Sequence, residues 1–130
     1  MVRTVPITVL EMPEFVRASS KLMTPEERMD ILSQIANDPM NGEVIPESGG
    51  LRKTRIAFSG RGKRSGGRVI YAYFGDDLPV FVFTCYAKNE RVDLSQKDKQ
   101  AFRKLLPMLV EEYRSSISKR IAKIRRGSYG

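Results

Sequence analysis

The 130-residue sequence contains no histidine and no tryptophan, and it has a single cysteine, Cys85. The absence of histidine removes the usual general base, most catalytic triads and nearly every kind of zinc site. Any acid–base chemistry must therefore use Lys, Arg, Tyr, Glu or Asp. Because Cys85 stands alone inside an apolar run, no disulfide can form within the chain, and we expect a core residue of a protein in a reducing cytosol.

Long apolar segments are also absent from this sequence. No run approaches the length of about eighteen apolar residues that a membrane-spanning helix needs. The N-terminus lacks a basic start followed by an apolar stretch, so we expect neither secretion nor membrane spanning and predict a cytoplasmic protein. The length and a hydrophobic fraction of 41% are sufficient for one domain with a real core.

Acidic residues are missing from two parts of the chain. Residues 48–75 and 113–130 together hold thirteen bases and no acid, whereas residues 1–47 hold eight acids and four bases. The net charge of +8 is therefore unevenly distributed, which favours a basic working face that binds a polyanion. The alternative is a generally basic surface.

The pattern of apolar residues and breakers predicts an α+β fold. A short strand is expected over residues 5–10, at a sheet edge or strand start because the segment contains a proline. A helix hairpin follows, since apolar residues recur at helical spacing over residues 15–22 and Thr24 with Pro25 forms a typical helix N-terminus. The second helix is expected to end at Asp38, before a proline.

Three strand segments with short connections then predict an antiparallel three-stranded meander. They cover residues 51–58, 68–74 and 80–86. Ser95 opens a last helix, within which Pro107 predicts a kink or a junction of two helices. We therefore assign residues 1–106 to the domain and residues 107–130 to a basic C-terminal helical extension of the same domain.

Basic and aromatic residues recur on one face of the predicted sheet. Lys53 and Arg55 are two residues apart in one strand, so their side chains point to the same side. Arg68 enters the next strand, and Tyr86 and Lys88 come at matching positions of the third, so all five could share one face. The alternative is an ordinary solvated sheet face, which commonly carries Lys and Arg.

A Gly-rich loop between the first two meander strands carries Arg61, Lys63 and Arg64. It lacks the Gly-Lys-Ser/Thr sequence of a Walker A loop, and it does not precede a helix whose N-terminus could hold phosphate. We interpret these three residues, together with Arg52, as RNA-binding contacts to the nucleic-acid backbone. A mobile exposed loop is the alternative.

Four motifs carry a resemblance to a known family. They are Gly42-Glu43-Val44-Ile45-Pro46, Gly49-Gly50-Leu51-Arg52-Lys53, Gly66-Gly67-Arg68-Val69-Ile70-Tyr71 and Tyr86-Ala87-Lys88-Asn89-Glu90. In this order, and over residues 5–105, the chain resembles the RelE/HigB toxins of bacterial type II toxin–antitoxin modules, and more narrowly their HigB-type branch.

The resemblance implies a RelE-like fold and an endoribonuclease, or mRNA interferase, that cuts messenger RNA in the ribosomal A site and inhibits translation. The implied partners are a cognate antitoxin, the ribosome and mRNA, with no cofactor and no metal. The implied catalytic positions are Lys53, Arg55, Arg68, Tyr86 and Lys88. Because the chain has no histidine, the general base and acid stay open between Lys53 and Lys88, with Glu90 as a further carboxylate.

The same basic face fits two other functions. One is a non-catalytic module that binds RNA or the ribosome. The other is a RelE-fold toxin directed at another target, such as gyrase. Cleavage of A-site message distinguishes the enzyme from the binding module, and DNA damage distinguishes the gyrase poison from both.

Overall fold

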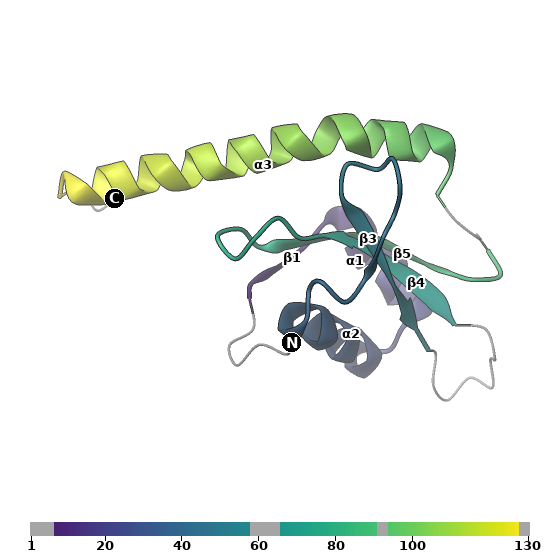
Figure 1. The fold of residues 1–130 in the computed structure, drawn as a ribbon. Coiled ribbons are helices and arrows are strands. Elements are labelled where there is room, and N and C mark those ends of the chain that lie inside the picture. The colour runs from purple at the N-terminus through teal and green to yellow at the C-terminus, as the bar shows by residue number, and fades with distance from the viewer. Residues whose placement is uncertain (1–6, 58–65, 91–93, 128–130) are drawn as a thin grey trace.

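The computed structural model describes residues 7–57, 66–90 and 94–127 of the chain. Within these ranges it has a five-stranded sheet and three helices, which confirms the α+β fold class (Figure 1). Helices α1 and α2 pack on one face of the sheet, and α3 crosses the other face. The elements in chain order are β1 (Val9–Glu11), α1 (Pro13–Leu22), α2 (Pro25–Asn37), β2 (Glu43–Val44), β3 (Leu51–Ile56), β4 (Gly67–Ala72), β5 (Val80–Ala87) and α3 (Gln96–Arg125).

The central strands form the predicted antiparallel meander, in which β3 pairs with β4 and β4 with β5. The strand β1 lies at one edge of the sheet, as expected, and is parallel to β5. Among the described residues it begins at Val9, later than the predicted segment of residues 5–10. The two-residue β2 adds a strand at the other edge, which was not predicted from the sequence.

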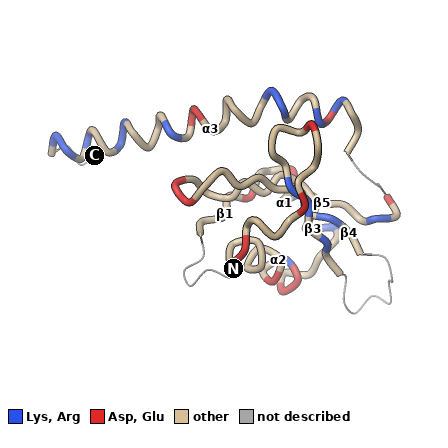
Figure 2. Tube along the Cα trace, viewed as in Figure 1, with Lys and Arg blue, Asp and Glu red and all other residues tan. Residues whose placement is uncertain are grey.

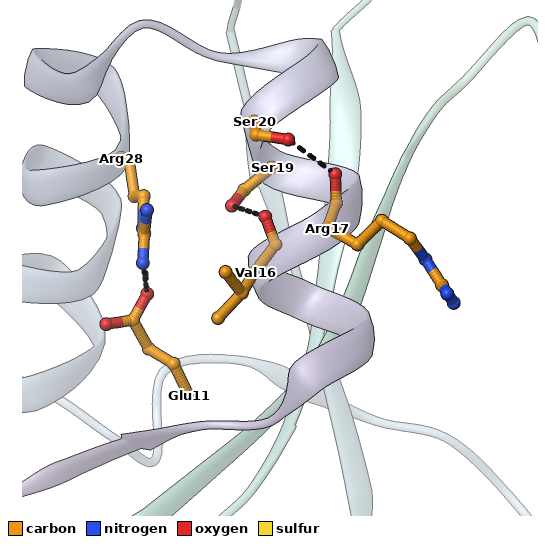
Figure 3. Close-up of polar contacts among 6 residues, drawn as sticks. All are labelled: Glu11, Val16, Arg17, Ser19, Ser20 and Arg28. Atoms are coloured by element: carbon orange, nitrogen blue, oxygen red, sulfur yellow. Dashed lines mark hydrogen bonds and ion pairs between the residues drawn. The ribbon is translucent and has the colours of Figure 1, made fainter.

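The second helix of the hairpin begins as its sequence indicates. In the predicted capping box, Thr24 Oγ1 accepts a hydrogen bond from the Glu27 N–H at 3.1 Å, and the Glu27 carboxylate accepts one from the Thr24 N–H at 2.9 Å. Arg28 of α2 pairs with Glu11 of β1, with Arg28 Nε 2.8 Å from Glu11 Oε1 (Figure 3). In the same view Arg17 points away from α2, so α1 presents a basic side chain outward.

Helix α3 is one continuous helix of 30 residues. Its N-cap is the predicted one, since Ser95 Oγ accepts a hydrogen bond from the Asp98 N–H at 3.1 Å. Pro107 lies inside the helix, so the expectation that two helices meet there is wrong. The neighbouring Leu106 is fully buried, and packing on the sheet here offsets the backbone hydrogen bond that a proline cannot donate. The assigned boundary between residues 106 and 107 thus falls within one helix.

The first half of α3 is held on the sheet by aromatic contacts. The rings of Phe83 and Phe102 meet edge to face with centroids 5.1 Å apart, and those of Phe81 and Tyr113 do so at 5.8 Å. The C-terminal end of α3 extends beyond the sheet (Figure 1). Helix α3 therefore has an N-terminal half that packs on the sheet and a C-terminal half that projects.

Charge is divided between the two ends of the molecule. Figure 2 shows Lys and Arg positions recurring along the projecting part of α3, whereas several Asp and Glu positions lie in the helix hairpin. None of the described helices combines the length and the apolar character that crossing a membrane requires. The acidic and basic residues that are separated along the sequence are therefore also separated in space.

Candidate functional site

A row of three paired residues crosses three neighbouring strands. We call it the basic row, and it consists of Arg55, Arg68 and Tyr86. Arg55 of β3 pairs with Arg68 of β4, and Arg68 pairs in turn with Tyr86 of β5. Directly paired residues of antiparallel strands project to the same face of a sheet. The fold therefore brings two guanidinium groups together at the strand ends, where like charges repel each other unless an anion lies between them.

Lys53 lies one row further along the same face, opposite Ile70 of β4. The sequence parity that predicted a shared face for Lys53 and Arg55 is confirmed. Lys53 Nζ is 3.9 Å from Glu43 Oε1 on the edge strand β2, and the Lys53 side chain is 24% exposed. The ammonium group is thus partly enclosed, with one carboxylate beside it.

Helix α3 packs on the far end of this sheet face, and the core cluster beneath it reaches along β4 and β5 to Ile70 and Tyr86. Leu51, Ala72 and Phe81 form a row there and belong to the same core cluster as Leu106 of α3. Arg55 lies outside that cluster and is exposed, and its guanidinium has no hydrogen bond or ion pair with another residue that the structure describes. Among the described residues, the β3 end of the row is therefore the part that is accessible to a polyanion.

Tyr86 is the buried member of the row. Its side chain is 6% exposed and packs in the core cluster that also holds Leu94 and Phe83. Arg68, its partner in β4, is partly exposed, and Arg68 Nη1 donates a hydrogen bond to the Gly67 carbonyl at 3.0 Å. A nucleobase can stack on the Tyr86 ring only after the neighbouring residues move.

Lys88 and Glu90 flank the turn that follows β5. Lys88 is exposed, and its backbone N–H donates to the Gly66 carbonyl at 2.9 Å, so strand pairing continues to this residue. The Glu90 carboxylate accepts a hydrogen bond from the Ala87 N–H at 3.2 Å. Glu90 therefore closes the turn, and Lys88 lies exposed in that turn, two residues after Tyr86.

Arg52 lies on the opposite face of the sheet from Lys53 and Arg55. It pairs with Tyr71, and its Nη1 donates to the carbonyls of Gly42 at 2.8 Å and Met40 at 3.1 Å. The structure thus does not bring Arg52 to the basic row. The three loop residues predicted to bind RNA, Arg61, Lys63 and Arg64, lie outside the described residues.

Beside the row lies a groove of about 670 Å³ that the sequence did not predict. Arg17 and Lys21 of α1 line one side, Thr84 and Tyr86 of β5 lie in it, and Phe102 of α3 lines another side. It joins segments far apart in the chain, so local periodicity could not reveal it. The one available signal was the pair of bases on the polar face of α1.

The groove is lined by the carboxylates Glu14, Glu90 and Asp98 as well as by Arg17 and Lys21, so the cations without carboxylates between them are those of the row. Burial raises the pKa of the Cys85 thiol to about 12, so this residue is not a thiolate nucleophile near neutral pH. Among the residues that the structure describes, no three His, Cys, Asp or Glu side chains lie together in a way that could hold a metal ion. The row of Arg55 and Arg68 is suited to bidentate contacts with phosphate oxygens.

A family model described as the RelE toxin of the RelE/RelB toxin–antitoxin system matches residues 11–127. The match includes every strand of the basic row. It also extends past residue 105, where the sequence resemblance ended, and takes in the projecting half of α3.

Proposed function

This chain belongs to the RelE family of toxins from RelE/RelB toxin–antitoxin systems, and we propose that it is a ribosome-dependent mRNA endoribonuclease that stops translation. Membership of the family implies a cognate antitoxin as a partner. The proposed target is messenger RNA in the ribosomal A site, and the proposed compartment is the cytoplasm.

The proposed reaction is attack of a ribose 2′-OH on the adjacent phosphorus. A base takes the hydroxyl proton, the 2′-oxygen bonds to phosphorus, and the 5′-oxygen leaves with a proton from an acid. The products are a 2′,3′-cyclic phosphate and a free 5′-hydroxyl. Negative charge grows on the non-bridging phosphate oxygens, so cations placed there in advance stabilise the transition state. The proposed route uses no metal ion and no cofactor.

Each candidate catalytic residue has a proposed part in this reaction. Arg55 and Arg68 bind the scissile phosphate, because guanidinium groups donate bidentately and stay charged. Lys53 and Lys88 are the candidates for base and acid, with Tyr86 as the neighbouring aromatic. Arg52, Arg61, Lys63 and Arg64 remain predicted contacts to the RNA backbone.

The observation that carries the proposal is the direct pairing of Arg55, which is exposed, with Arg68, which is partly exposed. Two like charges opposite each other destabilise the sheet, and a phosphate between them offsets that repulsion. A small catalytic set is sufficient if the ribosome holds the message in position, since positioning can contribute about 7–11 kcal/mol.

The test compares two double variants that each lose two positive charges. We expect Lys53→Ala/Arg55→Ala to lower the rate of A-site mRNA cleavage on programmed ribosomes by at least about a hundredfold. Lys97→Ala/Lys104→Ala, which changes two exposed bases of α3 that do not line the groove, should cleave like the wild type. Full cleavage by the first variant would show that the catalytic residues lie elsewhere.

Ribosome binding and DNA damage, measured alongside message cleavage, distinguish the other functions. Ribosome binding by the wild type without any cut message would favour a non-catalytic binding module. DNA damage without cut message would favour a gyrase-directed toxin. The finer placement in the HigB-type branch is also our proposal, and it rests on the four motifs of the sequence.

A further inference from the structure

The apolar stripe of α3 continues past the end of the domain. Phe102 and Tyr113 pack against the sheet, and Ile117, Ile121 and Ile124 follow at spacings of four, four and three residues. Such spacing keeps all of them on one face of the helix. Ile121 and Ile124 are 44% and 53% exposed, so the last part of the stripe faces solvent.

The anchorage of α3 ends before the stripe does. Among the described residues, the ion pair nearest to the C-terminal end of α3 joins Arg114 to Asp77, with Arg114 Nε 3.0 Å from Asp77 Oδ2. Beyond Ser118, no described residue of the helix makes a side-chain hydrogen bond or ion pair with the rest of the domain. Figure 1 shows this end projecting past the sheet. Helices gain most of their stability from a packed apolar face, and here no described residue covers Ile121 and Ile124.

Charge identifies what kind of molecule fits this face. Residues 114–126 contain six bases and no acid, and Figure 2 shows them along the projecting half. Arg120 falls within the stripe and Lys123 beside it, so a second copy of the helix would set positive charge against positive charge. RNA would neutralise the bases but would leave the isoleucine side chains in water. An acidic helix with its own apolar stripe satisfies both features.

We infer that the projecting half of α3, residues 114–127, is the docking surface for an acidic amphipathic helix of the cognate antitoxin. The antitoxin helix lays its apolar face on Ile117, Ile121 and Ile124, and its carboxylates pair with Arg120 and Lys123. The inference rests on the proposed toxin function for the identity of this partner. It adds where and by what chemistry the partner is held.

The probe for the test is a synthetic peptide of three heptads, with Leu at the a and d positions and Glu at the e and g positions. Its twin has Lys in place of every Glu. Binding of each labelled peptide to the full-length protein is followed by fluorescence anisotropy. We expect the acidic peptide to bind and the basic twin not to bind.

Two pairs of variants locate the surface. Ile121→Ala/Ile124→Ala removes the exposed apolar contacts and keeps helix propensity, so the helix itself should persist in circular dichroism. Arg120→Gln/Lys123→Gln and Lys119→Gln/Arg126→Gln each remove two positive charges, but only the first pair lies at the stripe. We expect the isoleucine variant and the first charge variant to bind the acidic peptide at least about tenfold more weakly, and the second charge variant to bind it nearly as the wild type does.

Three results would overturn the inference. The first is equal binding of the peptide by the wild type and the isoleucine variant. The second is wild-type dimerisation in light scattering that the isoleucine variant abolishes, because the face would then meet a second copy. The third is single-stranded RNA binding that depends on Ile121 and Ile124 as peptide binding does. Message cleavage is measured on the same variants, so peptide binding without any cleavage by the wild type would refute the proposed function and leave the docking surface standing.

Discussion

Tyr71 joins the sheet to the turn that follows α2. Its hydroxyl donates to the Pro39 carbonyl at 2.8 Å and accepts from the Gly42 N–H at 2.9 Å. Burial raises the pKa of Tyr71, so the hydroxyl stays protonated and able to donate near neutral pH. A Cβ on Gly42 would lie 2.3 Å from the hydroxyl oxygen, so this position has room for glycine alone.

Replacing Tyr71 with Phe should therefore destabilise the protein. The Pro39 carbonyl and the Gly42 N–H would lose a buried partner, which lowers the free energy of unfolding by about 1–3 kcal/mol. Urea denaturation followed by circular dichroism measures the change. The matched control is Tyr73→Phe, because that hydroxyl pairs with Asp76 in an exposed position. Equal losses in the two variants would contradict a special role for the Tyr71 hydroxyl.

The buried thiol of Cys85 makes stability depend on pH in the alkaline range. Its pKa is about 12 in the folded protein and near the ordinary value of 9.0 in the unfolded chain. Above pH 9.0 the unfolded state therefore holds fewer protons at this site, and the free energy of unfolding falls as pH rises toward 12.

We expect the stability difference between wild type and Cys85→Ala to shrink as the pH rises above 9.0, because alanine cannot titrate. Urea denaturation of both proteins from pH 7 to pH 10 provides the comparison, and other titrating groups contribute equally to the two curves. A constant difference over that range would mean that the thiol is not buried as the structure has it.

At the scale of elements, local signals in the sequence predicted most of the fold. Thr24 and Ser95 cap their helices as expected, since a cap depends on residues within one turn. The strand β2 could not be foreseen, because two residues form it only by lying against β3. We expected an interruption of α3 at Pro107 because proline disfavours a helix interior. The sequence alone does not show that the sheet buries the neighbouring Leu106 and stabilises the helix there.

Pro107 within α3 leads to a prediction about that helix. A proline in a helix interior removes one backbone hydrogen bond and crowds the preceding turn. We expect Pro107→Ala to raise the free energy of unfolding by about 1–3 kcal/mol, measured in urea. Leu105→Ala, an exposed neighbouring position, should change it little. A loss of stability in Pro107→Ala would show that the proline sets the path by which Leu106 reaches the core.

At the scale of the whole molecule, strand parity predicted part of the candidate site and chain topology decided the rest. Alternation along one strand was enough to place Lys53 and Arg55 on one face. Parity could not indicate that Arg52 would bind loop carbonyls, that Tyr86 would be buried, or that α3 would cover only part of the face. Those features depend on contacts between segments far apart in the sequence, which alternation within one strand does not encode.

The basic row should set how RNA binding depends on salt. Each phosphate neutralised on a single strand adds about 0.7 to the slope of log K against log salt concentration, through release of counterions. With 2′-O-methylated single-stranded RNA, which lacks the attacking hydroxyl, we expect Lys53→Ala/Arg55→Ala to reduce the slope by about 1.4. Lys97→Ala/Lys104→Ala changes the net charge equally, outside the groove, and should reduce the slope less. Equal reductions would mean that the RNA responds to the overall charge of +8 rather than to the paired row.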